Sequence, residues 1–414
     1  MTWEKWHPRP LDELGFVGRG KSRHRPRNDA RLYGGPYPFI QTADIMAADP
    51  YITTYSQTYS EFGLQQSKTW PPNTLCMTIA GANTAKTAIL KFEACFPDSV
   101  VGFIPDGRKS DLHFVKYSLD LMRHRFLSVS RGATQDNLSL DKLLSFPILV
   151  PDIEEQRRIA GILSAYDKLI ENNQRRIKIL ESMARALYRE WFVDFRFPGH
   201  ESVPRVPSTH GDIPRGWEVK TVRQVAGLIS RGPSLSYVDS GGVQVVNQRC
   251  IRNEEIEMQA VQYAAPLSEK KSHLYLQPRD VLINSMGVGT LGRVSRNLSI
   301  DEPTIIHNCI TVVRARTAEP TTAFLYYRLS DCQEHFESLG VGATGQTSLR
   351  IETIEDVQFA LPPFELLTAF EQVALPMWTQ VGVLKREIQN LRRTRDLLLP
   401  RLLSGRIDVE AIVS

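Results

Sequence analysis

The stretch Gly15-Phe16-Val17-Gly18-Arg19-Gly20 has a counterpart in the second half of the chain, Gly227-Leu228-Ile229-Ser230-Arg231-Gly232, with the first glycine, the arginine and the last glycine in register. Two further pairs follow in the same order: Pro72–Ile79 with Pro278–Ser285, and Gly132-Ala133-Thr134 with Gly342-Ala343-Thr344. Matches in one order at nearly one offset rarely arise by chance. A period of half the chain is too long for a solenoid, so the pattern indicates a duplicated domain, an internal repeat of two similar halves.

Each copy ends in an apolar stretch and a proline, and a long amphipathic helix is expected after each. Asp152 is a suitable N-cap for the first helix, which would be about 57 Å long from Glu154 to Trp191 at about 1.5 Å per residue. Positions spaced alternately by three and four form a heptad seam on each helix, which predicts coiled-coil packing. The first seam is Leu163, Tyr166, Ile170, Asn173, Ile177, Leu180, Ala184 and Leu187. The second is Ala374, Met377, Val381, Leu384, Ile388, Leu391, Arg395, Leu398 and Leu402.

Four residues interrupt these seams. Pro376 and Pro400 predict a kink or a break in the second helix, because proline lacks the N–H that a helix uses. Asn173 and Arg395 are polar, so they either fix the register of the coiled coil or lie at the edge of the seam.

The chain therefore divides into two globular segments and two helical ones. The predicted boundaries are 1–150 (first globular domain), 151–192 (central helix), 193–213 (linker), 214–363 (second globular domain) and 364–414 (second helix). The proline- and glycine-rich stretch Phe195–Trp217 predicts an extended linker. Short strands are expected at Thr74–Ile79, Val243–Val246, Asp280–Asn284 and Cys309–Val313, and short helices at Phe114–Arg125 and Ala323–Ser330. This mixture predicts an α+β (mixed α/β) fold for both globular domains.

Composition limits the class of protein. The hydrophobic fraction is 42% and the charged fraction 23%, values typical of folded globular chains. Without a signal peptide or an apolar span, we expect a cytoplasmic location, and the five scattered cysteines predict reduced thiols. Residues 1–150 hold 18 basic and 14 acidic side chains, whereas the segments 151–213, 214–363 and 364–414 have net charges of 0, −1 and +1.

Two glycine-rich motifs resemble nucleotide-binding loops. Gly15–Ser22 fits the phosphate-binding pattern G-x-x-x-x-G-K-[ST], but Arg23–Arg27 after it includes a proline and cannot open an ordinary helix. Gly287–Gly292 fits G-x-G-x-x-G, but strand and turn residues follow it instead of a helix. We expect the second to be a glycine-rich turn and the first not to bind a nucleotide.

Other catalytic patterns are incomplete. Asp49-Pro50-Tyr51 and Leu361-Pro362-Pro363-Phe364 each lack one element of the adenine methyltransferase motif. The acids after Pro151 have no lysine at nuclease spacing, and the histidines form no metal-binding pattern. We expect no catalytic, cofactor or metal site.

Basic and amide side chains favour contact with DNA. Arginine and lysine bind phosphates, while arginine, asparagine and glutamine also read base edges. The alternatives are a solvated basic loop and ordinary polar surface loops. The candidates in the first copy are Arg19, Lys21, Arg23, Arg25, Arg27 and the neighbouring Arg31, then Asn83, Thr84, Lys86, Arg131, Thr134, Gln135 and Asn137. Those in the second copy are Arg231, Asn247, Gln248, Arg249, Asn284, Ser285, Thr344, Gln346, Thr347 and Arg350.

The whole chain resembles the specificity subunit of type I restriction–modification enzymes. The residues that carry the resemblance are Pro151–Ala160, Arg189–Phe195, Leu397–Gly405 and Gly132–Gln135. The second copy departs from the family pattern, because Pro363–Leu367 lacks the Glu-Gln-Arg continuation and Pro376 interrupts the helix.

The resemblance implies two target-recognition domains that each read half of a bipartite DNA site, and two antiparallel helices that set the gap between the half-sites. It also implies two N6-adenine methyltransferase subunits and ATP-dependent restriction (translocase–nuclease) subunits as partners. S-adenosylmethionine, ATP and magnesium would then be bound by those partners. We expect a four-residue insertion in the first helix to change the gap alone. The competing hypotheses are an enzyme, either an NTPase using Gly15–Ser22 or a methyltransferase with unrecognised motifs, and a coiled-coil scaffold that binds only proteins.

Overall fold

A computed structural model describes residues 6–81, 84–130, 138–239, 241–252, 254–298, 300, 302–316, 319–339, 348–407 and 409. The chain forms two compact units. Unit 1 is Met1–Glu171 with Gln389–Ser414, and unit 2 is Asn172–Ile388. Each unit therefore contains one globular part and a section of each long helix.

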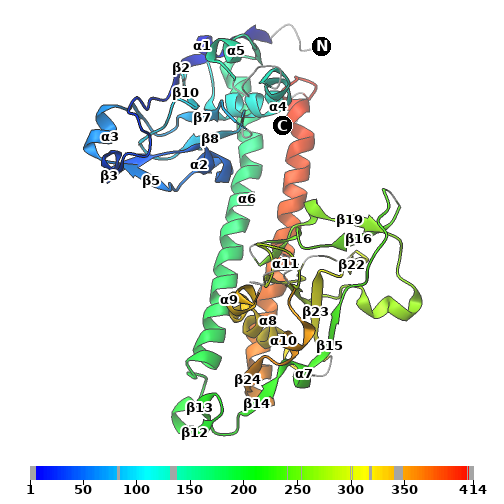
Figure 1. The fold of residues 1–414 in the computed structure, drawn as a ribbon. Coiled ribbons are helices and arrows are strands. Elements are labelled where there is room, and N and C mark those ends of the chain that lie inside the picture. The colour runs from blue at the N-terminus through cyan, green and yellow to red at the C-terminus, as the bar shows by residue number, and fades with distance from the viewer. Residues whose placement is uncertain are drawn as a thin grey trace. The chain divides into compact units, whose positions relative to one another are not determined.

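Unit 1 is built on a five-stranded and a four-stranded sheet (Figure 1). The first has the order β2-β10-β7-β8-β4, with bounds Gly15–Arg19, Val100–Pro105, Leu75–Thr78, Thr87–Leu90 and Tyr51–Ile52. The second has the order β5-β3-β9-β6, with bounds Gln57–Tyr59, Tyr33–Phe39, Ala94–Cys95 and Thr69–Trp70. A two-stranded ladder joins β1 (His7–Arg9) to β11 (Ile148–Val150). The helices are α1 (Leu11–Leu14), α2 (Thr42–Ala47), α3 (Glu61–Gln65), α4 (Leu112–Ser130) and α5 (Leu140–Leu144).

Unit 2 repeats this plan. Its four-stranded sheet has the order β15-β23-β20-β21, with bounds Ala226–Arg231, Ile310–Ala315, Val281–Asn284 and Val294–Arg296. A three-stranded sheet has the order β19-β16-β22, with bounds Gln262–Ala264, Val243–Val246 and Thr304–Ile306. Short ladders pair β14 (Glu218–Thr221) with β24 (Gln358–Leu361) and β17 (Ile251–Arg252) with β18 (Glu255–Ile256). The helices are α7 (Val222–Val225), α8 (Thr322–Asp331), α9 (Gln333–Ser338) and α10 (Ile351–Glu355). The α+β fold and the internal repeat predicted from the sequence are confirmed.

The glycine that ends each repeated stretch has the same packing in both copies. The Gly20 amide donates to the Val100 carbonyl at 2.8 Å, and the Gly232 amide donates to the Ile310 carbonyl at 3.1 Å. A Cβ on Gly20 would lie 2.3 Å from the Phe96 carbonyl oxygen, and a Cβ on Gly232 would lie 2.1 Å from the Ile306 carbonyl oxygen. Only glycine permits these close backbone approaches.

The two long helices are α6 (Ile153–Tyr188) and α11 (Phe364–Leu402). Asp152 caps α6 as predicted, accepting a hydrogen bond from the Glu155 amide at 2.8 Å. One heptad series of each seam is buried almost throughout: Leu163, Ile170, Ile177 and Ala184 on α6, and Ala374, Val381, Ile388 and Leu402 on α11. In the other series only Asn173 and Leu384 are buried, whereas Tyr166, Leu180, Leu187, Met377, Leu391 and Leu398 are half-buried.

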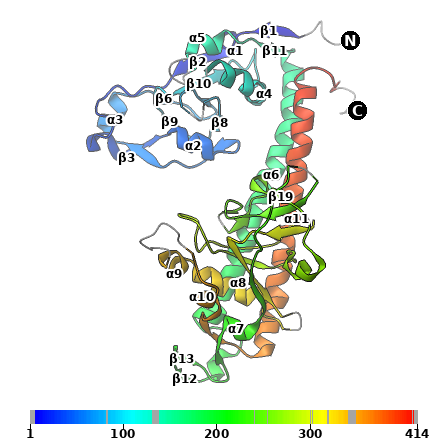
Figure 2. The ribbon, with the colours of Figure 1, turned by 45° about the vertical axis from the view of Figure 1, so that its right-hand side comes forward.

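Within each unit the two helix sections run antiparallel (Figure 2). In unit 1, residues near the start of α6 share a core with Leu402 and Leu403, and Asp167 pairs with Arg395. In unit 2, the end of α6 contacts the start of α11, where the rings of Tyr188 and Phe370 lie 6.4 Å apart.

The two prolines do not interrupt α11, and the two polar seam residues differ in their hydrogen bonding. α11 continues through Pro376 and Pro400 without a break, and neither ring is buried. Arg395 is ion-paired with the buried Asp167, so it joins the helices instead of lying unpaired at their edge. Asn173 is buried, and its Nδ2 has no hydrogen-bond partner among the described residues.

The segment predicted as an extended linker is folded. Strands β12 (Arg205–Ser208) and β13 (Gly211–Pro214) form a hairpin, and Phe197 and Trp217 are buried with their rings 5.6 Å apart. The aromatic residues at the ends of the segment explain this difference, because they bury apolar surface in the core of unit 2. Among the described residues, no helix combines the length and hydropathy of a membrane-spanning segment.

Candidate nucleic-acid interface

The backbone of the basic segment 19–31 in unit 1 is held in place by neighbouring elements. The Lys21 amide donates to the Phe96 carbonyl at 3.0 Å, and the Ser67 hydroxyl donates to the Lys21 carbonyl at 2.8 Å. Gln66 Oε1 accepts from the backbone amides of Arg23 and His24, at 2.6 and 3.0 Å. A segment restrained in this way presents its side chains without a large ordering cost on binding.

Protein groups already engage four of the predicted cations of this segment. Arg19 donates to the Asp98 carbonyl at 2.9 and 2.7 Å, and Arg27 pairs with the Asp98 carboxylate at 2.7 Å. Arg25 donates to the carbonyls of Ser22 and His24, both at 2.8 Å. Arg31 pairs with Asp29 at 2.7 Å.

Within the described part of the chain, the side chains of Lys21 and Arg23 form no hydrogen bond or ion pair. Arg23 is exposed and Lys21 is half-buried. These two cations are therefore available to phosphate groups without breaking an existing contact.

Asp29 organises the far end of the segment. It accepts from the Arg31 amide at 3.0 Å, and its carboxylate lies 2.8 Å from His24 Nε2. The Arg31 guanidinium holds the pKa of Asp29 well below its usual range, with a smaller contribution from His24. The carboxylate therefore stays charged and keeps both basic side chains in position.

Phe62 on α3 was not among the predicted residues. Its ring is 40% exposed and lies 5.2 Å from the His24 ring, edge-on, while the Arg31 guanidinium lies 5.2 Å from its centroid. Exposed aromatic rings in basic surroundings can stack on bases or wedge between them. Phe62 and His24 are far apart in the sequence, so no local pattern signalled this contact.

The remaining predicted residues of unit 1 are less informative. Thr84 is buried, and its hydroxyl donates to the Gly81 carbonyl at 2.7 Å, whereas Lys86 is half-buried. The other predicted positions lie outside the described residues: Asn83, Arg131, Thr134, Gln135 and Asn137.

In unit 2 the predicted asparagine side chains are buried, and their hydrogen bonds hold a turn in place. Asn247 is buried, accepts from the Arg249 amide at 2.9 Å and donates to Gln262 Oε1 at 3.1 Å. Asn284, also buried, donates to the Gln248 carbonyl at 3.2 Å. Arg249 itself is exposed, and its side chain forms no hydrogen bond or ion pair with the described residues.

A protonated thiol closes the other side of this turn. Cys309 Sγ lies 2.8 Å from Gln248 Oε1, to which it donates, and burial raises the pKa of the Cys309 thiol. All five cysteines are free and buried, which agrees with the prediction of reduced thiols. The arrangement makes Arg249 the exposed cation of a rigid turn.

The other predicted residues of unit 2 differ in exposure. Ser285 is buried, with its hydroxyl 2.6 Å from that of Thr311. Arg231 is half-buried and donates to the Leu349 carbonyl, and Arg350 is exposed just before α10. Thr344, Gln346 and Thr347 lie outside the described residues.

These two units correspond to a known family. The description "Type I restriction modification DNA specificity domain" matches the chain twice, over residues 3–182 and residues 214–367. The chain belongs to this family. Each matched range covers one copy of the repeat, and together they include the basic segment of unit 1 and the Arg249 turn of unit 2.

Individual relatives agree with this assignment. The chain is 25% identical to the type I restriction enzyme MjaIX specificity subunit of Methanocaldococcus jannaschii, over 98% of this chain and 94% of the relative. It is 23% identical to the HindI specificity subunit of Haemophilus influenzae, over 68% of this chain and 74% of the relative. The crystal structure of the type I S subunit from M. genitalium shares the fold, with a TM-score of 0.62, 16% identity and 96% coverage of both chains.

In this member of the family, the two glycine-rich motifs do not form nucleotide loops. Gly15–Arg19 is strand β2, paired along its length with β10, and the amides of Gly20 and Lys21 donate to protein carbonyls. These amides cannot also surround a phosphate. Gly287–Gly292 forms a turn that leads into strand β21, as predicted.

Proposed function

We propose that this chain is the DNA-reading subunit of a type I restriction–modification complex, with each unit recognising one half of a bipartite target. The observation that carries the proposal is the double match to the specificity domain, on two units in which the order β2-β10-β7-β8 corresponds to β15-β23-β20-β21. Each unit also presents cations whose side chains have no hydrogen bond or ion pair with the described residues, Lys21 and Arg23 in unit 1 and Arg249 in unit 2.

The contacts of the predicted residues indicate two kinds of role, contact with DNA and positioning of the protein backbone. Lys21 and Arg23 are exposed or half-buried cations that suit DNA phosphates, and Arg249 has the length to reach a guanine edge. Asn247, Asn284 and Ser285 are positioning residues, because their polar atoms are used inside the protein.

The chain would contribute no catalysis of its own. Two methyltransferase subunits would bind the α6 and α11 helices and methylate adenine, and restriction subunits would cleave DNA with ATP. S-adenosylmethionine, ATP and magnesium would be held by those partners. Among the described residues, no group of three or more metal-ligating side chains was found.

Modified-base sequencing tests the proposal. Genomic DNA is compared between cells that carry the gene and cells that lack it, with the methyltransferase subunit kept in both. We expect N6-methyladenine at one interrupted two-part motif to disappear on deletion and to return with the wild-type gene. A methylation pattern that does not change would contradict the proposal.

Variants assign the half-sites. Arg249→Ala should relax or abolish one half of the motif, whereas Lys21→Ala with Arg23→Ala should weaken methylation of all sites together, because phosphate contacts carry no sequence information. Arg108→Ala and Arg215→Ala are matched controls, since both arginines are exposed and lie outside the proposed surfaces. The absence of salt-dependent DNA affinity, even in the assembled complex, would favour the protein-only scaffold.

A further inference from the structure

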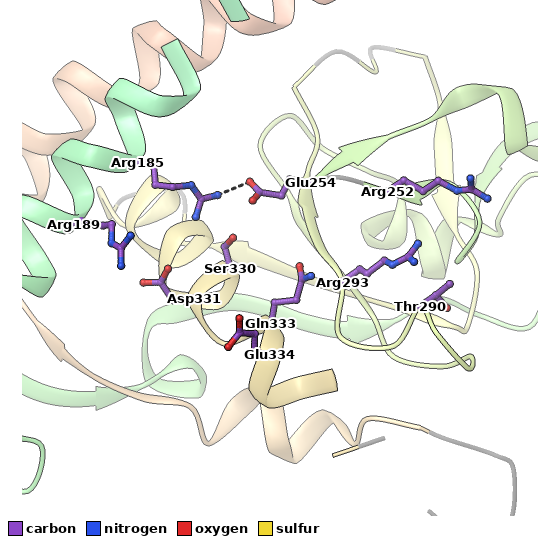
Figure 3. A pocket seen from close by; sticks show the side chains of 10 residues that line it. All are labelled: Arg185, Arg189, Arg252, Glu254, Thr290, Arg293, Ser330, Asp331, Gln333 and Glu334. Atoms are coloured by element: carbon purple, nitrogen blue, oxygen red, sulfur yellow. Dashed lines mark hydrogen bonds and ion pairs between the residues drawn. The ribbon is translucent and has the colours of Figure 1, made fainter. Parts of the chain in front are cut away.

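Unit 2 contains a second basic site, separate from the Arg249 turn. A cavity of about 1130 Å³ opens between α6, the β17–β18 hairpin, the glycine-rich turn before β21 and the α8–α9 junction (Figure 3). Every described residue that lines it is polar or charged. Four are arginines that come from distant parts of the chain: Arg185, Arg189, Arg252 and Arg293.

The glycine-rich turn fixes one of these arginines. Arg293 donates to the Gly289 carbonyl at 2.8 Å and to the Ile251 carbonyl at 3.3 Å. Gly287 and Gly289 have φ values of +111° and +72°, a conformation that favours glycine and lets the turn bring the Gly289 carbonyl to Arg293. The motif that resembles a nucleotide loop therefore forms a wall of this cavity.

The four arginines of the cavity face three carboxylates in its lining, Glu254, Asp331 and Glu334, so the arginines are in excess by one. Arg185 pairs with Glu254 at 2.5 Å, and the Tyr326 hydroxyl donates to the same carboxylate at 2.7 Å. Among the described residues, Arg293 donates to carbonyls alone, and Arg252 forms an exposed ion pair with Glu257 at 3.8 Å.

The opposite wall carries Arg189 together with the carboxylates of Asp331 and Glu334. The Arg189 side chain forms no hydrogen bond or ion pair with the described residues. Burial raises the pKa of Asp331, and Arg185, Arg328 and Arg189 oppose this shift. Thr290 and Gln333 also line the cavity, where the Thr290 hydroxyl donates to the Gly287 carbonyl at 3.4 Å and Gln333 Nε2 donates to Glu337 Oε1 at 2.9 Å.

We infer that this cavity binds a phosphate-bearing ligand through its arginines Arg189, Arg252 and Arg293. Guanidinium groups bind phosphate with two parallel hydrogen bonds, and a site lined only by polar groups suits an anion better than an apolar molecule. Its volume is sufficient for a nucleotide. The phosphate could come from a free nucleotide or from a DNA strand, and only the second source rests on the proposed function.

The test is direct titration of the full-length chain with inorganic pyrophosphate, followed by ATP and duplex DNA. The cavity variant is Arg189→Gln with Arg252→Gln, because neither side chain donates a hydrogen bond within the described structure. The control is Arg196→Gln with Arg316→Gln, which removes the same charge from exposed ion pairs elsewhere in unit 2. We expect the cavity variant to bind pyrophosphate about tenfold more weakly or worse, and the control to bind like the wild type.

The titrations with ATP and with duplex DNA show whether the bound phosphate belongs to a free nucleotide or to a DNA strand. Competition by ATP, with DNA affinity equal in the cavity and control variants, identifies a free nucleotide. A weaker DNA affinity in the cavity variant, with a salt slope reduced by about one to two, identifies a strand phosphate. If the wild type binds pyrophosphate no more tightly than the cavity variant, the inference is overturned, whatever the methylation motif shows. If thermal unfolding shows that the cavity variant does not fold, Arg189→Lys with Arg252→Lys replaces it. Lysine keeps the positive charge but lacks the planar guanidinium group, so we expect a loss of pyrophosphate affinity between those of the wild type and the glutamine variant.

Discussion

Arg395 on α11 donates from Nη1 to Oδ1 of Asp167 on α6 at 2.6 Å, and the Asp167 side chain is only 4% exposed. The same carboxylate accepts from the Tyr117 hydroxyl on α4. One buried acid therefore joins both long helices to the globular part of unit 1. Burial and the Asp167 charge together raise the pKa of Tyr117. Burial lowers the pKa of Arg395, but Asp167 and Asp396 together outweigh it, so that this pKa is raised.

Removal of Arg395 should destabilise unit 1 strongly. Arg395→Ala leaves the Asp167 carboxylate buried with a single hydrogen-bond donor, so we expect a loss of about 2–4 kcal/mol in the free energy of unfolding. Chemical unfolding of the full chain measures it. Arg393→Ala is the control, because Arg393 is exposed two residues away on the same helix and should change stability by less than about 0.5 kcal/mol.

A double-mutant cycle separates the pair from its parts. With Asp167→Asn, the further loss from Arg395→Ala should be clearly smaller than in the wild type, because no buried charge is left behind. Equal losses in both backgrounds would mean that the ion pair does not join the helices energetically.

Glycine at the end of the repeated stretch should be essential in both units. Gly20→Ala and Gly232→Ala each force a Cβ into a backbone carbonyl, and a cost of about 1–3 kcal/mol is expected for each. Gly161→Ala is a control with the opposite sign, because open space surrounds that position in α6 and alanine favours a helix by about 0.5–1 kcal/mol. Thermal unfolding of the three variants checks the order; stable Gly20→Ala protein would show that the close approach is not required.

Periodicity and repetition predicted most of this fold. The burial of Leu163, Ile170 and Ile177 follows directly from their heptad spacing. The N-cap role of Asp152 follows from its position after a proline. Long-range packing was not visible. The hairpin within Phe195–Trp217 depends on aromatic residues that meet a core built from other segments, which a local pattern rich in proline and glycine does not report.

The candidate interface was predicted by residue type and only partly by position. Their residue type made Arg19 and Arg27 candidates for DNA contact, but both meet Asp98, which comes from a distant part of the sequence. Asn247 and Asn284 have side chains that can read bases and are nevertheless buried. A polar side chain can form its hydrogen bonds within the protein or with DNA, and the sequence alone does not show which, because the neighbours in the folded structure decide it.

His113 should make unit 1 less stable in mild acid. Its Nε2 lies 2.9 Å from the Tyr51 hydroxyl, and burial lowers the pKa of the imidazole. Lys91 and Lys116 lower this pKa further, while Asp111 and Asp167 oppose the shift. The unfolded chain, with a histidine pKa of about 6.5, then binds more protons, so stability falls as the pH drops below about 6.5 toward the folded pKa.

Unfolding of His113→Gln at about pH 7.5 and about pH 5.5 tests this sign, because glutamine can still accept from Tyr51 and does not titrate. The loss of stability on acidification should be smaller in the variant than in the wild type. His124→Gln, on the exposed side of the same helix, should leave the loss unchanged. An identical pH dependence of His113→Gln and wild type would rule out this histidine as its source.

Glu371 on α11 should stabilise the start of α8. Its Oε1 accepts from the Ala323 amide at 2.9 Å, and the side chain is buried. Glu371→Ala leaves that amide without its acceptor, at an expected cost of about 1–3 kcal/mol, whereas Glu371→Gln keeps an acceptor and should cost less. Chemical unfolding with Glu387→Ala, an exposed glutamate of α11, as the control measures the difference. Equal stability of Glu371→Ala and Glu387→Ala would argue against the cap.

The helices can be lengthened without disturbing either unit. Each unit holds its own sections of α6 and α11 by internal contacts, such as Asp167 with Arg395 in unit 1 and Glu181 with Lys385 in unit 2. Four residues inserted after Glu171 and four after Ile388 fall between the units in both helices, so these contacts are kept. The four-residue insertion in the first helix alone, which the sequence led us to expect would change only the gap, would displace one member of such pairs, so the insertion is made in both helices.

On the proposed function, the paired insertion adds about 6 Å of helix, which corresponds to about one to two base pairs of DNA. We expect modified-base sequencing to show both half-site sequences unchanged and the gap between them wider by that amount. Substitution of alanine for Asn172 and Gln389, the exposed residues at the two insertion points, leaves the helix length unchanged and should leave the gap unchanged. A wider gap in this length-matched control, or an unaltered gap in the insertion variant, would mean that helix length does not set the spacing of the target.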